Sequence, residues 1–161
     1  MLHLLGFLDR LSGAIGGLLQ SPLLLAMRLF FGIWFVILGF AKLQDIDKFI
    51  ESLTAMNVPY PEVGAWLAAL TETIGGAFLA IGFLSRLVSP PLAIVMVVAY
   101  ATAHVESLYV LTSDPAQFVN QPPFIFLVTT LLVWAFGPGF FSIDHFLLRK
   151  PEPSKETGGK A

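Results

Sequence analysis

The chain has 161 residues, of which 56% are hydrophobic and only 12% are charged. Soluble globular domains carry about 25% charged residues, so the composition excludes an ordinary soluble domain and predicts an all-α integral membrane protein. About four helical spans of roughly 20 residues fit this length. The formal net charge of −2 suggests no nucleic-acid partner, and the lipid bilayer is the first partner that we expect. Because the chain has no cysteine, it cannot itself exchange disulfides, hold an iron–sulfur cluster or attach a c-type haem.

Apolar side chains recur at helical spacing within residues 1–20, at Leu4, Leu8, Leu11, Ile15 and Leu18. This pattern predicts an amphipathic helix that lies at the membrane interface. The alternative is a cleaved signal peptide, which fits less well because its start lacks Lys and Arg and because Arg10 interrupts the apolar run. Ser21 and Pro22 then resemble an N-cap followed by a proline at the first helical position, so the interfacial helix should end there.

Four apolar segments follow, at residues 21–41, 62–84, 87–103 and 123–136. They predict a four-transmembrane-helix bundle within one domain of residues 21–149. The last segment is short, because fourteen residues rise only about 21 Å as a helix, unless that helix begins before Pro122. The first loop, residues 42–61, has the amphipathic spacing of a short helix. The polar residues 150–161 predict a disordered tail.

The positive charges are unevenly distributed between the two sides of the predicted bundle. An even number of spans places both termini on one side, which would carry Arg10, Arg86, Arg149, Lys150, Lys155 and Lys160. The opposite side would carry only Lys42 and Lys48. Because cytoplasmic loops are enriched in Lys and Arg, we expect both termini in the cytoplasm.

A polar stripe runs along the first predicted span. Its members recur at alternating spacings of four and three residues and are Arg28, Gly32, Phe35, Gly39 and Lys42. Residues at these spacings share one helix face, and we expect this face to point into the bundle because Leu, Phe, Ile and Trp occupy the opposite side. An arginine inside a bilayer costs at least roughly 2.5–3.5 kcal/mol, so Arg28 should have a partner.

Glu72, in the middle of the second span, is the predicted partner, and we expect an Arg28–Glu72 ion pair inside the bundle. The alternative is that Arg28 extends to the lipid head groups while Glu72 is a neutral acid bonded to its neighbours. Small residues allow spans to approach closely. The glycines predicted to serve this packing are Gly32, Gly39, Gly75 and Gly76.

Three further polar side chains gather near the other end of the bundle. Lys42 ends the polar stripe, and Tyr100 and His104 are four residues apart at the end of the third span. Together they predict a ligand pocket in which a quinone head group could be bound, although Lys42 and the aromatic residues could equally be interface anchors. A single histidine cannot make a metal site, and His3 and His145 should lie on the opposite side, so no metal and no intrinsic cofactor are expected.

The order of these features resembles the DoxX family of small four-span membrane proteins. The resemblance covers about residues 22–148 and lies in Arg28, Gly39–Leu43, the Glu72-x-x-Gly75-Gly76 stretch, Leu79-x-x-Gly82-x-x-x-Arg86, His104 and Gly137-Pro138-Gly139-x-x-Ser142-Ile143-Asp144. It implies a four-helix bundle in the bacterial inner membrane. Some members of this family form a subunit of a thiosulfate:quinone oxidoreductase, and others associate with superoxide dismutase and a thiosulfate sulfurtransferase in an oxidant-defence assembly.

Three functions from different classes fit this sequence. The first is a redox-linked membrane subunit that binds quinone near Lys42 and His104. The second is a non-catalytic scaffold that holds soluble redox proteins at the membrane through the N-terminal helix and the tail. The third is a small proton-linked transporter that uses Glu72 as its proton site and needs a homodimer, because four spans are few.

Overall fold

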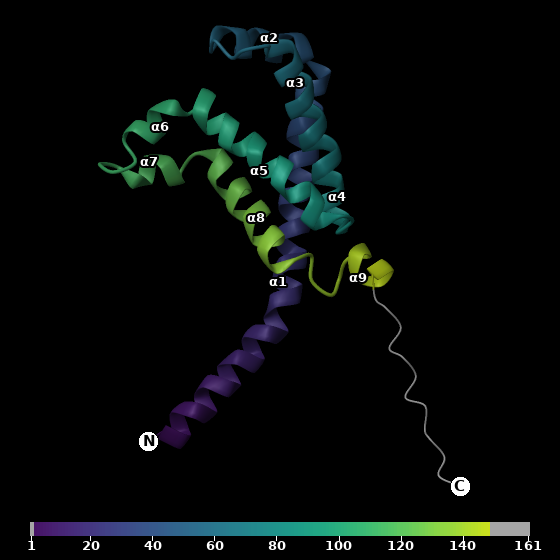
Figure 1. Cartoon of the computed structure of the whole chain (residues 1–161), viewed down its shortest axis with the longest axis vertical. Helices are drawn as coiled ribbons and strands as arrows, with labels where there is room; N and C mark the ends of the chain where they lie inside the picture. The colour runs from purple at the N-terminus through teal and green to yellow at the C-terminus, as the bar shows by residue number, and fades with distance from the viewer. Residues whose placement is uncertain (1, 149–161) are drawn as a thin grey trace.

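The computed structural model describes residues 2–148, and helices are the only regular elements in that range (Figure 1). The predicted tail, residues 150–161, lies outside the described residues, as do the side chains of His3 and His145. Three stretches of the described chain are long and apolar enough to cross a membrane, namely Asp9–Gln44, Pro61–Ile81 and Ser85–Thr102. The prediction of an all-helical membrane protein is therefore confirmed.

The first span belongs to a single long helix, α1 (Leu2–Gln44). It is followed by the short surface helix α2 (Ile46–Ala55). The second span is made of α3 (Pro61–Leu70), a π-helical turn η1 (Thr71–Gly75) and α4 (Gly76–Ile81). A tight turn leads into the third span, α5 (Ser85–Thr102).

The remaining helices complete the bundle. Two short helices, α6 (Val105–Tyr109) and α7 (Pro115–Val119), connect α5 to α8 (Pro122–Phe136). Helix α8 begins at Pro122 and rises about 22 Å, so the fourth apolar helix is short, one of the two possibilities that the sequence left open. The chain then turns at Gly137 and ends its described part with α9 (Ile143–Leu148).

The predicted boundary at Ser21 and Pro22 is wrong, because α1 continues through both residues. Proline removes one backbone hydrogen bond, and helices of membrane proteins tolerate this loss more readily than soluble helices do. Figure 1 shows the N-terminal part of α1 leaving the bundle as an extension of the first span. The whole helix is about 65 Å long, roughly twice the thickness of the hydrocarbon core. That residues 1–20 lie along the membrane surface stays a prediction.

The three spans and the shorter apolar helix α8 form two packed pairs around a common core. Helix α1 packs against α4 and η1, α5 packs against α8, and α1 also contacts α8. The core cluster consists of Phe35, Leu79, Leu92, Met96, Phe126 and Val133. Leu, Ile, Phe and Trp side chains such as Phe30, Trp34 and Ile37 are exposed on the outside of α1, which suits contact with lipid tails.

The polar stripe of α1 faces into the bundle, as its spacing predicts. Arg28 is fully buried, Phe35 is 1% exposed, and Gly32 and Gly39 are buried between helices. A methyl group built on Gly32 would lie 2.7 Å from the backbone nitrogen of Ala80. The stripe is therefore the surface along which α1 contacts the second span.

Candidate functional site

An apolar pocket of about 470 Å³ opens near the end of the bundle where α1 terminates, which we call the Lys42 end. Its walls come from α1, α2, α3, η1, α5 and the first turn of α8. Apolar side chains such as Phe49, Leu67 and Val95 form most of its surface. A volume of this size lies in the usual range for small-molecule sites.

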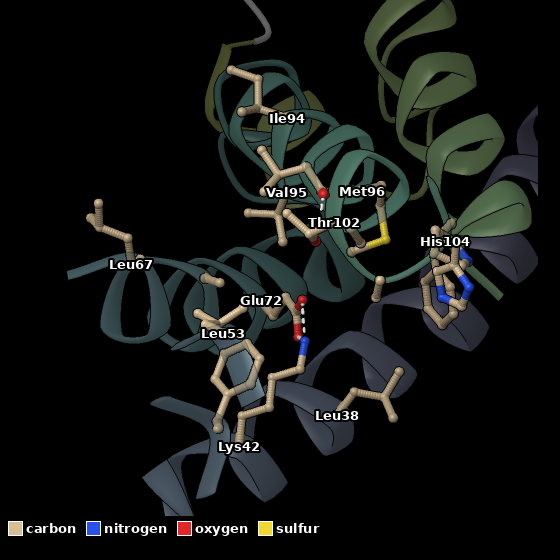
Figure 2. Close-up of a pocket in the computed structure, with 18 of the residues that line it drawn as sticks. Leu38, Lys42, Leu53, Leu67, Glu72, Ile94, Val95, Met96, Thr102 and His104 are labelled. Carbon is tan, nitrogen blue, oxygen red and sulfur yellow. Dashed lines mark hydrogen bonds and ion pairs between the residues drawn. The ribbon is translucent and has the colours of Figure 1, made fainter. Parts of the chain in front are cut away.

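One ion pair lies in this apolar wall. The Lys42 ammonium donates hydrogen bonds to both carboxylate oxygens of Glu72, each at 2.6 Å (Figure 2). The Glu72 side chain is only 2% exposed, whereas that of Lys42 is 32% exposed. The ring of Phe49, from α2, covers the ammonium at 5.1 Å from its centroid. Because an ammonium carries three N–H groups, one remains for a ligand in the pocket.

The local backbone explains why Glu72 reaches the pocket. Glu72 lies in the π-helical turn η1, and such turns shift the side chains that follow around the helix and recur at functional sites. Gly39 of α1 permits the close contact at this level, since a methyl group there would lie 2.5 Å from the Thr73 hydroxyl. Gly75 and Gly76 lie in the next turn, packed against Leu92 and Phe35 respectively.

The predicted Arg28–Glu72 ion pair is not formed, because Glu72 binds Lys42 instead. The reason is that Arg28 and Glu72 lie at different heights along the bundle axis. Arg28 lies beside Gly82, ten residues after Glu72 in the second span, and ten residues of helix rise about 15 Å. No arginine side chain spans that distance, so the two members of the predicted pair belong to opposite ends of the bundle.

Arg28 instead joins the C-terminal segment to the spans at the other end, which we call the Arg28 end. Its guanidinium donates to the Phe141 carbonyl oxygen at 2.5 Å and interacts electrostatically with Asp144. Asp144 accepts hydrogen bonds from the backbone N–H groups of Leu84 and Ser85, at 2.7 and 2.9 Å. These bonds cap the first turn of α5 and close this end of the bundle. No pattern in the sequence indicated that the Phe141 carbonyl oxygen would accept a hydrogen bond from Arg28.

Of the three residues predicted to form the ligand pocket, Lys42 and His104 line it together. Figure 2 shows His104 across the pocket from Lys42, just beyond the end of α5. Tyr100 does not belong with them. Its hydroxyl donates to the Phe118 carbonyl oxygen at 2.8 Å, its ring stacks on that of Phe118, and it is only 3% exposed. Tyr100 therefore fastens α7 to α5, which corrects its assignment as a ligand donor.

The sequence did not identify α2 as a wall of the pocket. Phe49, Leu53 and Met56 of this loop region line it beside the ion pair. The signal was present in the amphipathic spacing of residues 42–61, which shows an apolar face but not what that face covers. Among the residues that the structure describes, no three potential metal ligands gather, and the sequence-based expectation of no metal site stays a prediction.

These features define a small membrane protein of packed helices with an ion-paired, mainly apolar pocket at one end of its bundle. Residues 23–105, just over half of the chain, match the family model described as DoxX. The chain belongs to the DoxX family. No curated protein and no solved structure matches the chain.

Proposed function

We propose that this protein is a redox-linked membrane subunit that binds the head group of a quinone in the pocket at the Lys42 end. The observation that carries the proposal is the Lys42–Glu72 pair in a mainly apolar pocket wall. Ligand sites combine apolar walls with a few polar groups that fix orientation. A quinone has the matching chemistry, because its ring and tail are apolar and its two carbonyl oxygens accept hydrogen bonds.

Different residues of the pocket bind different parts of the quinone. The free N–H of Lys42 donates to one carbonyl oxygen, while Glu72 holds the ammonium in place. His104 lies partly buried across the pocket and supplies a second donor. Phe49 and Val95 enclose the ring and exclude water. An isoprenoid tail then leaves the pocket along the exposed apolar surface of the spans.

The redox balance requires a donor outside the chain. A bound quinone takes up two electrons and two protons to become a quinol, and the oxidation of two thiosulfate ions to one tetrathionate, with formation of a sulfur–sulfur bond, releases two electrons. We propose that this donor acts directly or through a soluble redox partner, as in the assemblies formed by members of the family. Lys42 and His104 both lie where they can pass protons to the ligand.

We further propose that the protein lies in the bacterial inner membrane with both termini in the cytoplasm. The excess of Lys and Arg on the side of the termini supports this orientation. The Lys42 end then faces the periplasm, and quinone enters from the outer leaflet.

Titration of the purified protein in lipid nanodiscs with a short-chain quinone tests the proposed site. Replacing Lys42 by methionine or His104 by alanine should weaken binding about ten- to a hundredfold, because each change removes a hydrogen bond that involves a charged or polar donor in an apolar pocket. The matched control is Lys48→Met, which removes an exposed lysine of the neighbouring surface helix whose partner is Asp45. Equal affinity of the wild type and both pocket variants would refute the quinone site, as would the absence of saturable binding to the wild type.

The same variants distinguish the alternatives. In vesicles with thiosulfate and quinone, a redox subunit loses turnover with Lys42→Met or His104→Ala. If the protein is instead a scaffold, it should stop binding its soluble partner when residues 1–20 are deleted. It should still bind that partner in the Lys42→Met and His104→Ala variants.

A further inference from the structure

A second pocket, of about 500 Å³, lies at the Arg28 end. It is bounded by the extension of α1 near Gln20, by the turn between α4 and α5, and by the Gly137–Gly139 turn that follows α8. Three of the four spans begin or end at this level, since α4 ends at Ile81, α5 begins at Ser85 and α8 ends at Phe136. This pocket therefore lies where the lipid head groups meet the hydrocarbon core.

Arg86 supplies an exposed positive charge to this second pocket. Its guanidinium lies against the turn at Gly137, where a methyl group would be 3.1 Å from Nη2 and 3.2 Å from Nε. Gly137 has a φ of 79°, a conformation that glycine adopts readily. No ion pair of Arg86 occurs among the described residues. Its charge is thus positioned and available to a ligand.

The neighbouring charges do not cancel that of Arg86. Asp144 also lines the second pocket, but its carboxylate accepts two backbone N–H bonds and interacts with the buried Arg28. Among the described residues in and beside this pocket, Arg28 and Arg86 carry two positive charges against the one negative charge of Asp144, so the balance is positive. An anionic group would be favoured here.

Apolar side chains surround the charge on the lipid side. Leu87 is 68% exposed, Phe136 59% and Phe140 64%, and all three line the second pocket. An occupant with a negative head and apolar chains satisfies both parts of this surface, whereas a free phosphate ion satisfies only Arg86.

We propose that the second pocket binds one anionic phospholipid, with its phosphate on the Arg86 guanidinium and its acyl chains along Leu87 and Phe136. Arginine pairs well with phosphate because its planar donors match the phosphate oxygens. The site is independent of the quinone pocket, which lies at the opposite end of the bundle.

Native mass spectrometry of the full chain in detergent, with added phosphatidylglycerol or phosphatidylcholine, tests this inference. The wild type should retain phosphatidylglycerol preferentially, and Arg86→Gln should lower its affinity about fivefold while leaving phosphatidylcholine unchanged. Arg86→Lys keeps the charge but not the planar donors, so it should fall between the two. Arg10→Gln is the control, because it removes an exposed positive charge from α1 outside the pocket.

Three outcomes would overturn the inference. The first is equal retention of both lipids by the wild type, and the second is an equal loss in Arg10→Gln and Arg86→Gln, which would mean general attraction to positive charge. The third is full displacement of the lipid by inorganic phosphate at matched concentration, which would identify a soluble phosphate site. The circular dichroism of each variant checks that its helices are intact.

Discussion

Replacing Lys42 by methionine should destabilise the protein more than replacing Lys42 and Glu72 together. The single change leaves the carboxylate of Glu72, which is 2% exposed, without its ammonium. Breaking a buried ion pair costs about 3–5 kcal/mol, and we expect the lower end of this range because Lys42 is one-third exposed. In the double variant Lys42→Met with Glu72→Gln, no uncompensated charge remains, so most of the lost stability should return.

Unfolding of the four proteins of this cycle in mixed micelles, followed by circular dichroism, measures the coupling between the two residues. Lys48→Met serves as the control. It breaks an exposed pair with Asp45 at 3.1 Å, whose side chains are 76% and 65% exposed, and should change stability little. The cycle compares the wild type, Lys42→Met, Glu72→Gln and the double variant. If the losses of stability of the two single variants simply add in the double variant, Lys42 and Glu72 do not stabilise each other.

Replacing Gly39 by alanine should separate α1 from the second span. The added methyl group would lie 2.5 Å from the Thr73 hydroxyl and 2.6 Å from the Thr73 backbone nitrogen. Backbone cannot move aside as a flexible side chain does, so we expect a loss of about 1–3 kcal/mol, the usual cost of overpacking. The shift would also displace Lys42, three residues further along α1, from Glu72 and weaken the quinone binding that we propose.

Gly64→Ala is the matched control for this change. Gly64 lies in α3 and also lines the pocket at the Lys42 end, yet a methyl group there meets only the end of the Leu53 side chain, at 3.8 Å. Because alanine is the better helix former, this change should stabilise the protein by about 0.5–1 kcal/mol. Thermal unfolding in detergent compares the two variants. Equal stability of Gly39→Ala and Gly64→Ala would show that α1 and η1 are not in close contact.

The sequence predicted the helical membrane class, the four apolar segments and the inward face of α1, because each follows from the local pattern of apolar and polar residues. The spacing from Arg28 to Lys42 alone selects the face that the structure buries. Local patterns also placed Lys42 and His104 near the same end of the bundle, where they line one pocket.

The partner of Glu72 could not be predicted, because it depends on the register between two helices. Counting residues from the first loop, residues 42–61, assumes that the end of the first span and the start of the second span lie at the same height in the membrane. In the structure Gly39 contacts Thr73 and Gly32 contacts Ala80, so the first two turns of α3 lie beyond the end of α1. This offset of two turns, about 11 Å, places Glu72 beside the Lys42 end of α1 rather than near Arg28.

The prediction of a helix boundary at Ser21 and Pro22 was wrong because a local start signal does not show whether the preceding chain is also helical. Serine followed by proline is a start signal in water, where the preceding chain can leave the helix and hydrogen-bond to solvent. In α1 the helix continues through Gly13, Gly16 and Gly17 and across the proline, so the residues before Ser21 do not leave the helix. The role of Asp144 could not be predicted either. Its carboxylate accepts hydrogen bonds from the backbone of Leu84 and Ser85, which precede it by 60 and 59 residues.

An experimental structure of the protein in nanodiscs with a short-chain quinone is the most direct test of the proposed function. We expect ring density in the pocket at the Lys42 end, with one carbonyl oxygen within hydrogen-bonding distance of Lys42 Nζ and the other facing His104. The Lys42–Glu72 ion pair should persist beside it. Quinone density elsewhere on the bundle, with this pocket closed or filled by side chains, would contradict the account.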